Sequence, residues 1–291
     1  MAHIAIVAPS GLINIELLQR GIKVLEQAGH TIDIMPHVCG TPNRVFSETD
    51  ENRASDLIKA MTMPGIDIVI CTRGGYGAVR TAQLLPRGFW SHYDGRPLVG
   101  FSDITVFHSL AAMHGHSTIH GPMIKHFALK GLDSNDIKAT LEAMEGKSVK
   151  MTLNSHSLNR LGKASGTLIG GNLSILYSLR GTYADVLKNP KGKILFIEDL
   201  AEYHYHIDRM MQNLRLGGVL KKIDGLIVGQ FTDMKDGSTP FGLNAYEIIA
   251  EAMKGTSCPI LFGYPAGHAD DVNFPLRMGK PISIDGLSII N

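Results

Sequence analysis

Cysteine is scarce in this sequence, and the spacings typical of disulfide-rich or metal-binding proteins are missing. The 291 residues contain three cysteines, Cys39, Cys71 and Cys258, which lie far apart. An odd number of distant cysteines makes a poor disulfide framework, so a reducing compartment is the simplest interpretation. No HExxH or CxxC spacing occurs, so we expect no metal site.

A charge excess and long apolar runs are missing as well. The 28 basic and 27 acidic residues give a formal net charge of +1, which offers no general attraction for nucleic acid or an anionic membrane. No apolar stretch approaches the roughly 18 residues that span a bilayer, and the first residues, MAHIAIVAPSG, lack the features of a signal peptide. We therefore expect a cytoplasmic protein that binds neither nucleic acid nor membranes.

Two common nucleotide-binding signatures are absent. The sequence has no G-x-x-x-x-G-K-[ST], and its glycine-rich segment RGGYG (73–77) does not match G-x-G-x-x-G. Adjacent glycines after an apolar strand nevertheless let backbone N–H groups approach a ligand closely. RGGYG therefore predicts either a phosphate-binding turn or one donor of an oxyanion hole.

The first 130 residues alternate between buried strands and amphipathic helices. Apolar runs end in the turns APSG, TRGGYG and GFSD, and helical periodicity follows them. This order predicts an α/β fold with a parallel, doubly wound sheet, a Rossmann-like domain over residues 1–130. The three turns should then lie along the carboxyl edge of the sheet, where such folds bind ligands.

The composition and the pattern of elements change after residue 130. Residues 131–165 are polar and rich in Lys, Ser and Asn, and we interpret them as a linker. Residues 166–291 contain short apolar strands with glycine turns, interrupted by helical stretches at HYHIDRMMQNLRLGG and NAYEIIAEAMKG. They predict a second α+β domain around a strand-rich core.

The segment GFSDIT (100–105) has the pattern of a strand–turn–helix elbow that exposes a serine nucleophile. The elbow signature G-x-S-x-G requires a second glycine, where this chain has Ile104. The alternative is that Ser102 or Asp103 only caps the following helix, as both residue types commonly do. A nucleophile would need a histidine as base and a carboxylate that orients the histidine.

Two residues of the second domain are candidates for these roles. Among 13 histidines, His268 lies in the loop FGYPAGHADD directly after a predicted strand, and Glu198 ends the apolar strand ILFI. Both have ordinary alternatives, a surface-loop histidine and a turn-capping acid, and Asp199 competes with Glu198 for the acid role. Asn172 in GGNLS either hydrogen-bonds a substrate or caps the next helix.

Seven segments resemble, in the same order, the LD-carboxypeptidase family, which includes muropeptide LD-carboxypeptidases and microcin C immunity proteins. They extend from residue 73 to residue 271 of the chain. The segments are RGGYG (73–77), GFSDIT (100–105), HGP (120–122), GTLIGGNLSIL (166–176), FIEDLAE (196–202), IDRMMQNL (207–214) and GHADD (267–271).

The resemblance implies a serine peptidase with a triad of Ser102, Glu198 and His268, on a Rossmann-like domain joined to a β-rich, barrel-like C-terminal domain. His268 would take the Ser102 proton, Ser102 would attack an amide carbonyl, and Glu198 would orient the imidazole. The backbone N–H groups of Asp103 and Gly75 would stabilise the oxyanion. Neither a metal nor an organic cofactor is needed, and a homodimer is expected.

The implied substrate is a muropeptide of peptidoglycan recycling, cut between the L-centre of diaminopimelate or lysine and a terminal D-alanine. Arg73 is a candidate partner for the substrate carboxylate, with a structural salt bridge as its alternative, and Gly74 and Asn172 are further substrate-binding candidates. The chain has AEYHYHIDR where the family often has a proline. His204 and His206 are therefore expected to line the pocket and alter specificity.

Two other functions fit the sequence. An immunity-type hydrolase would use the same triad to cleave an aminoacyl-nucleotide amide. A non-catalytic, Rossmann-type ligand-binding protein would need no triad at all. The substrate cleaved, and the effect of removing Ser102, separate these functions from a muropeptide carboxypeptidase.

Overall fold

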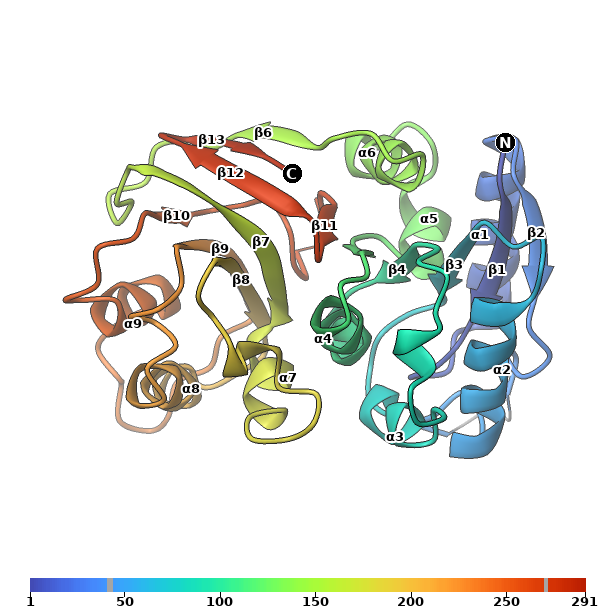
Figure 1. Cartoon of the computed structure of the whole chain (residues 1–291), viewed down its shortest axis with the longest axis horizontal. Coiled ribbons are helices and arrows are strands. Elements are labelled where there is room, and N and C mark those ends of the chain that lie inside the picture. The colour runs from blue at the N-terminus through green and yellow to red at the C-terminus, as the bar shows by residue number, and fades with distance from the viewer. Residues whose placement is uncertain (41–43, 270–271) are drawn as a thin grey trace. The chain divides into compact units, whose positions relative to one another are not determined.

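The computed structural model describes residues 1–40, 44–269 and 272–291, and the chain forms two compact units (Figure 1). The first comprises Met1–Lys147 and Phe274–Arg277, and the second comprises Ser148–Asn273 and Met278–Asn291. None of the helices in the described ranges combines the length and apolarity needed to cross a membrane.

The first unit is built on a six-stranded sheet with the order β11-β5-β4-β3-β1-β2. Neighbouring strands from β5 to β2 pair in parallel, so the predicted doubly wound parallel sheet is confirmed. β11, from near the end of the chain, joins this sheet although the sequence did not predict it there. The strands are β1 (His3–Val7), β2 (Thr31–Ile34), β3 (Ile68–Cys71), β4 (Leu98–Gly100), β5 (Thr118–His120) and β11 (Leu276–Met278).

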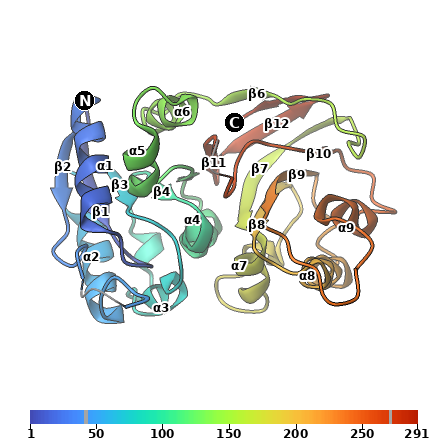
Figure 2. The same ribbon diagram turned by 180° about the vertical axis from the view of Figure 1, so that it is seen from behind.

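Helices cover both faces of this sheet, because the strand order changes direction after β2. Figures 1 and 2 show α1 on the face opposite to α2. The α1 helix packs against α5, where a Cβ at Gly21 would lie 2.5 Å from the Ile124 carbonyl oxygen. The helices are α1 (Ile15–Gln27), α2 (Asp50–Thr62), α3 (Ala78–Gln83), α4 (Thr105–Met113), α5 (Ile124–Lys130) and α6 (Asn135–Met144).

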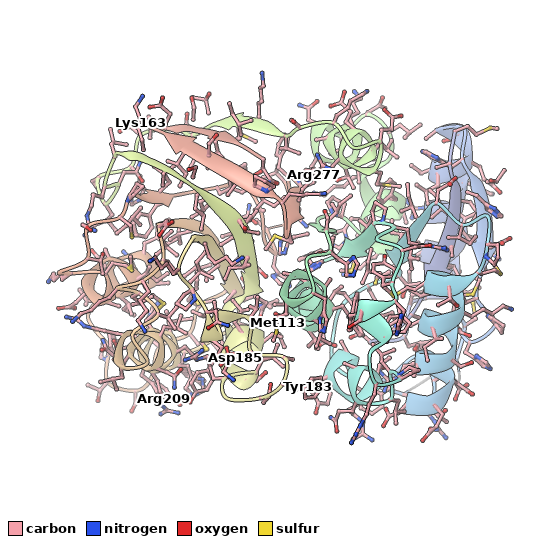
Figure 3. All side chains as sticks on the ribbon, in the orientation of Figure 1. Met113, Lys163, Tyr183, Asp185, Arg209 and Arg277 are labelled. Carbon is pink, nitrogen blue, oxygen red and sulfur yellow. The ribbon has the colours of Figure 1, made fainter. Side chains whose placement is uncertain are left out.

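The polar stretch expected as a linker, residues 131–165, does more than connect. It contains α6, strand β6 (Lys150–Thr152) and the first residues of β7. The α6 helix is held by its buried Asp136, which pairs with Lys130 Nζ at 2.7 Å. Arg277 of β11, labelled in Figure 3, donates from Nη1 to the Gly146 carbonyl just after α6, at 3.0 Å. Polar composition therefore concealed a helix whose apolar side is buried.

The second unit is built on a seven-stranded sheet with the order β10-β9-β8-β7-β12-β13-β6. The strands from β10 to β7 pair in parallel, and those from β7 to β6 pair antiparallel. The strands are β7 (Lys163–Asn172), β8 (Lys193–Leu200), β9 (Gly225–Thr232), β10 (Ile260–Phe262), β12 (Pro281–Asp285) and β13 (Ser288–Ile290), with β6. The helices are α7 (Leu173–Ser178), α8 (His204–Leu216) and α9 (Ala245–Ala252).

Three contacts join residues at or just before the start of β7 to other strands of this sheet. Lys163, labelled in Figure 3 at the start of β7, pairs with Asp285 at the end of β12 at 2.9 Å. Arg160, just before β7, forms an isolated antiparallel bridge with Ile260 of β10. The Asn159 side chain accepts the Phe262 N–H at 2.8 Å, so the segment before β7 contacts the β10 edge at two successive residues. The predicted mixed, strand-rich fold is confirmed.

One buried histidine helps to fix the end of β4. His108 of α4 donates from Nε2 to the Gly100 carbonyl at 2.9 Å, and its Nδ1 accepts from the Thr118 hydroxyl at 2.7 Å. Both ring nitrogens are thus used by a neutral imidazole. Burial lowers the pKa of His108 from 6.5 to about 4, because a charged ring would lose its water shell.

We expect acid to destabilise the protein through His108. A histidine whose pKa is lower in the folded state stabilises fully above its unfolded pKa, and that contribution is lost as pH falls toward the folded pKa, here from 6.5 to about 4. His108→Gln should therefore remove up to about 3 kcal/mol of the pH dependence of the free energy of unfolding. Urea unfolding at pH 7 and pH 4 measures this, with His114→Gln at the exposed end of the same helix as control. An unchanged pH dependence in His108→Gln would contradict the assignment.

Candidate active site

Ser102 lies where a strand turns into a helix. It follows β4, opens a single 3-10 turn (Ser102–Ile104), and α4 begins directly afterwards. Its φ is 64°, and only Ala201 and Asp233 share a positive φ among the non-glycine residues that the structure describes. A left-handed backbone costs a non-glycine residue about 1–3 kcal/mol, and such strain gathers at functional sites. The local geometry is that of a nucleophile elbow.

Neither Ser102 nor Asp103 caps the helix that follows, since α4 begins without a side-chain cap. The Asp103 carboxylate is directed elsewhere. Its Oδ2 accepts from Ser10 Oγ at 2.6 Å and from the Ala78 N–H, the first of α3, at 2.8 Å. The alternative of an ordinary helix cap is thus corrected to a cap of α3.

Asp103 ties together three turns at one edge of the first sheet. They are the turn after β1 with Ser10, the glycine turn before α3, and its own turn after β4. Burial raises the pKa of the Asp103 carboxyl, while the bonds from Ser10 and Ala78 oppose that rise. The predicted meeting of these turns at the carboxyl edge is therefore observed.

The glycines of RGGYG allow the backbone to approach the serine. A Cβ at Gly74 would lie 2.8 Å from Ser102 Cβ and 3.0 Å from its Oγ. Gly75 has a φ of 122°, a conformation that only glycine adopts readily. These contacts explain the two adjacent glycines, and the oxyanion role of the Gly75 and Asp103 N–H groups stays a prediction.

The Arg73 side chain donates hydrogen bonds to two nearby backbone carbonyls. Its Nε donates to the Gly74 carbonyl at 3.2 Å and its Nη1 to the Leu12 carbonyl at 3.4 Å. These two carbonyls are the hydrogen-bond partners of Arg73 within the described part of the chain, and its alternative role in a structural salt bridge is left open. Recognition of a substrate carboxylate by Arg73 stays a prediction.

In the second unit, Glu198 and His268 meet. Glu198 lies on β8 and is fully buried, and its Oε2 is 2.7 Å from His268 Nδ1. The register of β8 with β9 shifts between Ile197 and Asp199, so an irregularity of the strand coincides with Glu198. The sequence placed these two candidates 70 residues apart, and the fold brings them into one hydrogen bond.

The contact fixes how the imidazole can act. A carboxylate accepts hydrogen bonds only, so Nδ1 carries the proton that His268 donates to Glu198. The base role then falls to Nε2, which is the division of roles found in Ser–His–acid triads. The pair therefore has the chemistry of an oriented general base.

Asn172 and Asp199 form a separate polar network beside this pair. Asn172 is paired in register with Glu198 and caps α7, because its Oδ1 accepts the Ile175 N–H at 3.2 Å. Its Nδ2 donates to Asp199 Oδ1 at 2.9 Å. Burial first, and then the neighbouring Glu198, raise the pKa of Asp199 to about 7. The cap role of Asn172 is observed, and its substrate role stays a prediction.

The two histidines of AEYHYHIDR lie at the start of α8. His204 Nδ1 is 3.7 Å from Asp236 Oδ2, and His206 Nδ1 is 2.8 Å from Glu202 Oε2. Among the described residues, no three His, Cys, Asp or Glu side chains form a group suited to a metal ion. The predicted substrate contact of His204 is not tested by this arrangement, and the Asp270–Asp271 end of GHADD lies outside the described residues.

Two residues that hold the His268 loop were missed from the sequence. Gln230 of β9 accepts the Ala269 N–H at 3.0 Å, and Asn273 accepts the Gly267 N–H through Oδ1 at 3.1 Å. The available signal for Gln230 was a polar residue that interrupts the apolar strand GLIVGQF. Nothing in the sequence distinguished Asn273.

Two family models match the sequence of this chain. Models of the LD-carboxypeptidase N-terminal and C-terminal domains match residues 4–121 and 165–284. The chain belongs to the LD-carboxypeptidase family. It is therefore an enzyme, a serine carboxypeptidase, and the resemblance seen in the sequence is confirmed.

Several relatives of this LD-carboxypeptidase are similar over nearly the whole chain. The murein tetrapeptide carboxypeptidase of Pseudomonas aeruginosa is 32% identical, over 98% of this chain and 93% of its own length. The crystal structure of muramoyltetrapeptide carboxypeptidase from Oxalobacter formigenes is 31% identical and superimposes with a TM-score of 0.86, covering 99% of this chain and 97% of that one. The microcin C7 self-immunity protein of Escherichia coli is 24% identical, over 91% of this chain and 84% of its own length.

The contact between Gly74 and Ser102 predicts a loss of activity in Gly74→Ala. The added methyl would displace the serine, and misplacing a reacting group by about 1 Å can lower turnover by about a hundredfold. We expect kcat to fall by about tenfold to a hundredfold, measured on any peptide substrate of the enzyme. Gly237→Ala is the control, since a Cβ there would lie no closer than 3.6 Å to its neighbours. Equal kcat values for both variants would show that Gly74 does not constrain Ser102.

Proposed function

We propose that this LD-carboxypeptidase hydrolyses the L,D-amide bond to the terminal D-alanine of muropeptide tetrapeptides. The observation that carries the proposal is the 2.7 Å contact between His268 Nδ1 and buried Glu198. The left-handed backbone of Ser102 at the elbow adds support. So does the similarity to the murein tetrapeptide carboxypeptidase of Pseudomonas aeruginosa.

In the proposed mechanism Ser102, Glu198 and His268 act as one triad. His268 Nε2 takes the hydroxyl proton while Ser102 Oγ bonds to the amide carbon, and Glu198 stabilises the imidazolium that forms. The tetrahedral intermediate collapses, the C–N bond breaks, and the imidazolium returns the proton to the departing amine of D-alanine. Water, deprotonated by the same imidazole, then hydrolyses the acyl-enzyme.

The remaining candidates are assigned to charge stabilisation and recognition. The N–H groups of Asp103 and Gly75 would donate to the oxyanion, where removal of one donor typically costs about 10²–10³ in turnover. Arg73 would pair with the free carboxylate of the terminal D-alanine. Asn172 and His204 would contact the peptide.

The proposal includes a cellular setting. A muropeptide substrate places the enzyme in peptidoglycan recycling, and we propose that it acts there as a cytoplasmic homodimer. The recycling role is supported by the name of the murein tetrapeptide carboxypeptidase of Pseudomonas aeruginosa. The three widely spaced cysteines suit a reducing compartment, and the homodimer rests on the family resemblance alone.

Release of D-alanine from a muropeptide tetrapeptide tests the proposal. Wild-type enzyme should release it, and Ser102→Ala should lower kcat by about 10⁴-fold or more, because the nucleophile is lost. Mass spectrometry of the tripeptide product and of free D-alanine measures both. Ser55→Ala, an exposed serine of α2, is the control and should retain wild-type turnover.

A parallel assay with an aminoacyl-sulfamoyl adenosine separates the alternatives. Cleavage of this compound alone would replace the muropeptide substrate with that of an immunity-type hydrolase, the function named for the relative from Escherichia coli. Equal turnover in wild type and Ser102→Ala would leave Ser102 without a catalytic role.

Glu198→Gln should also reduce turnover, because the amide keeps the contact to Nδ1 but removes the charge that stabilises the imidazolium. We expect kcat to fall by about a hundredfold or more with a small change in KM. Glu251→Gln serves as control, because Glu251 is an exposed acid of α9 whose ion pair among the described residues is with Lys254. Retention of more than half of the wild-type kcat in Glu198→Gln would rule out Glu198 as the orienting acid.

A further inference from the structure

The loop that carries His268 is bound by one side chain of β9 at two residues that follow His268 in the chain. Gln230 Oε1 accepts the Ala269 N–H at 3.0 Å, and Gln230 Nε2 donates to the Val272 carbonyl at 3.3 Å. A primary amide has a donor and an acceptor in a fixed plane. Gln230 uses each of them on a different backbone group of the same loop.

The chain that enters the loop is also held by Gln230. Its backbone N–H donates to the Ala266 carbonyl at 2.9 Å. Gly267, with a φ of 143°, packs so closely that a Cβ there would lie 2.9 Å from Gln230 Cβ. The backbone on either side of His268 therefore rests on one residue of a regular strand.

This support matters because Glu198, the partner of His268, cannot shift to keep the hydrogen bond if the imidazole moves. Glu198 is fully buried on the adjacent strand β8, and its contact with His268 Nδ1 is 2.7 Å long. His268, in contrast, lies in residues 263–269, which follow β10 and form neither helix nor strand. A shift of that segment by about 1 Å would break the hydrogen bond, and misplacement on this scale lowers turnover by about a hundredfold.

We propose that Gln230 is a positioning residue of the carboxypeptidase reaction, which sets the His268 imidazole against Glu198. Its side-chain amide binds the loop after His268, and its backbone N–H binds the loop before it. The inference rests on the proposed function, because it takes His268 as the base. Gln230 touches neither substrate nor reacting atoms in this role. It acts through the backbone of the loop.

Two substitutions at Gln230 test its two side-chain hydrogen bonds. Gln230→Met keeps the length of the side chain and removes both bonds, so kcat should fall by about tenfold to a hundredfold with KM nearly unchanged. Gln230→Glu keeps an acceptor for the Ala269 N–H but opposes the Val272 carbonyl with a second acceptor. Its loss in kcat should be smaller than that of Gln230→Met. Gln212→Met is the control, and its kcat should equal that of the wild type. In the described part of the chain the side chain of Gln212, on α8, bonds to Asp208.

A spectroscopic readout separates positioning from general stability. The proton between His268 Nδ1 and Glu198 should give a low-field resonance, assigned by its loss in His268→Gln. Gln230→Met should broaden or shift this resonance, whereas Gln212→Met should leave it in place. Circular dichroism confirms folding, and Gln230→Glu supplies the comparison if Gln230→Met does not fold.

Two results would overturn the inference. One is a folded Gln230→Met, or in its place Gln230→Glu, with wild-type kcat and an unshifted resonance. The other is a loss of thermal stability in either variant with no change in kcat of the folded molecules. If wild-type enzyme releases no D-alanine, the proposed substrate fails, and the resonance in the Gln230 variants still decides whether Gln230 positions His268.

Discussion

The hydrogen bond between Glu198 and His268 is the interaction on which the candidate site depends. A carboxylate buried in a sheet is strongly disfavoured unless a donor meets it, and the imidazole is the donor that this fold supplies at 2.7 Å. Two features of the neighbouring strands lie at this hydrogen bond. The irregularity of β8 coincides with Glu198, and Gln230 holds the loop of His268 from the next strand.

In the first unit the main constraint is the left-handed backbone of a half-buried serine at a tight turn. Ser102 adopts a left-handed backbone, and Gly74 approaches it so closely that no side chain fits between them. The next residue, Asp103, binds two other turns through one carboxylate oxygen, and these bonds hold the strained turn in place. Strain at one residue is thus offset by hydrogen bonds and burial at its neighbours.

The sequence predicted what depends on local pattern and could not predict what depends on tertiary contact. Strand and helix periodicity predicted the parallel sheet of the first unit, and the family resemblance named Ser102, Glu198 and His268 as candidates, of which Glu198 and His268 form a hydrogen bond. The helix α6 was missed because its stretch is polar overall, although Ile137 and Ala143 are buried. The cap of α3 by Asp103 and the support of the loop by Gln230 join residues 25 and 39 positions apart, and no local pattern encodes such pairs.

Two adjacent acids on β8 show how the fold separates chemically similar groups. Glu198 meets a single imidazole, whereas Asp199 accepts bonds from Asn172, from the Ser174 N–H and from its neighbour Leu200. Burial and the charge of Glu198 raise the pKa of Asp199 to about 7, while the three N–H donors oppose that rise. Two neighbouring carboxyls of one strand thus have different partners: Glu198 contacts the His268 imidazole, and Asp199 binds the start of α7.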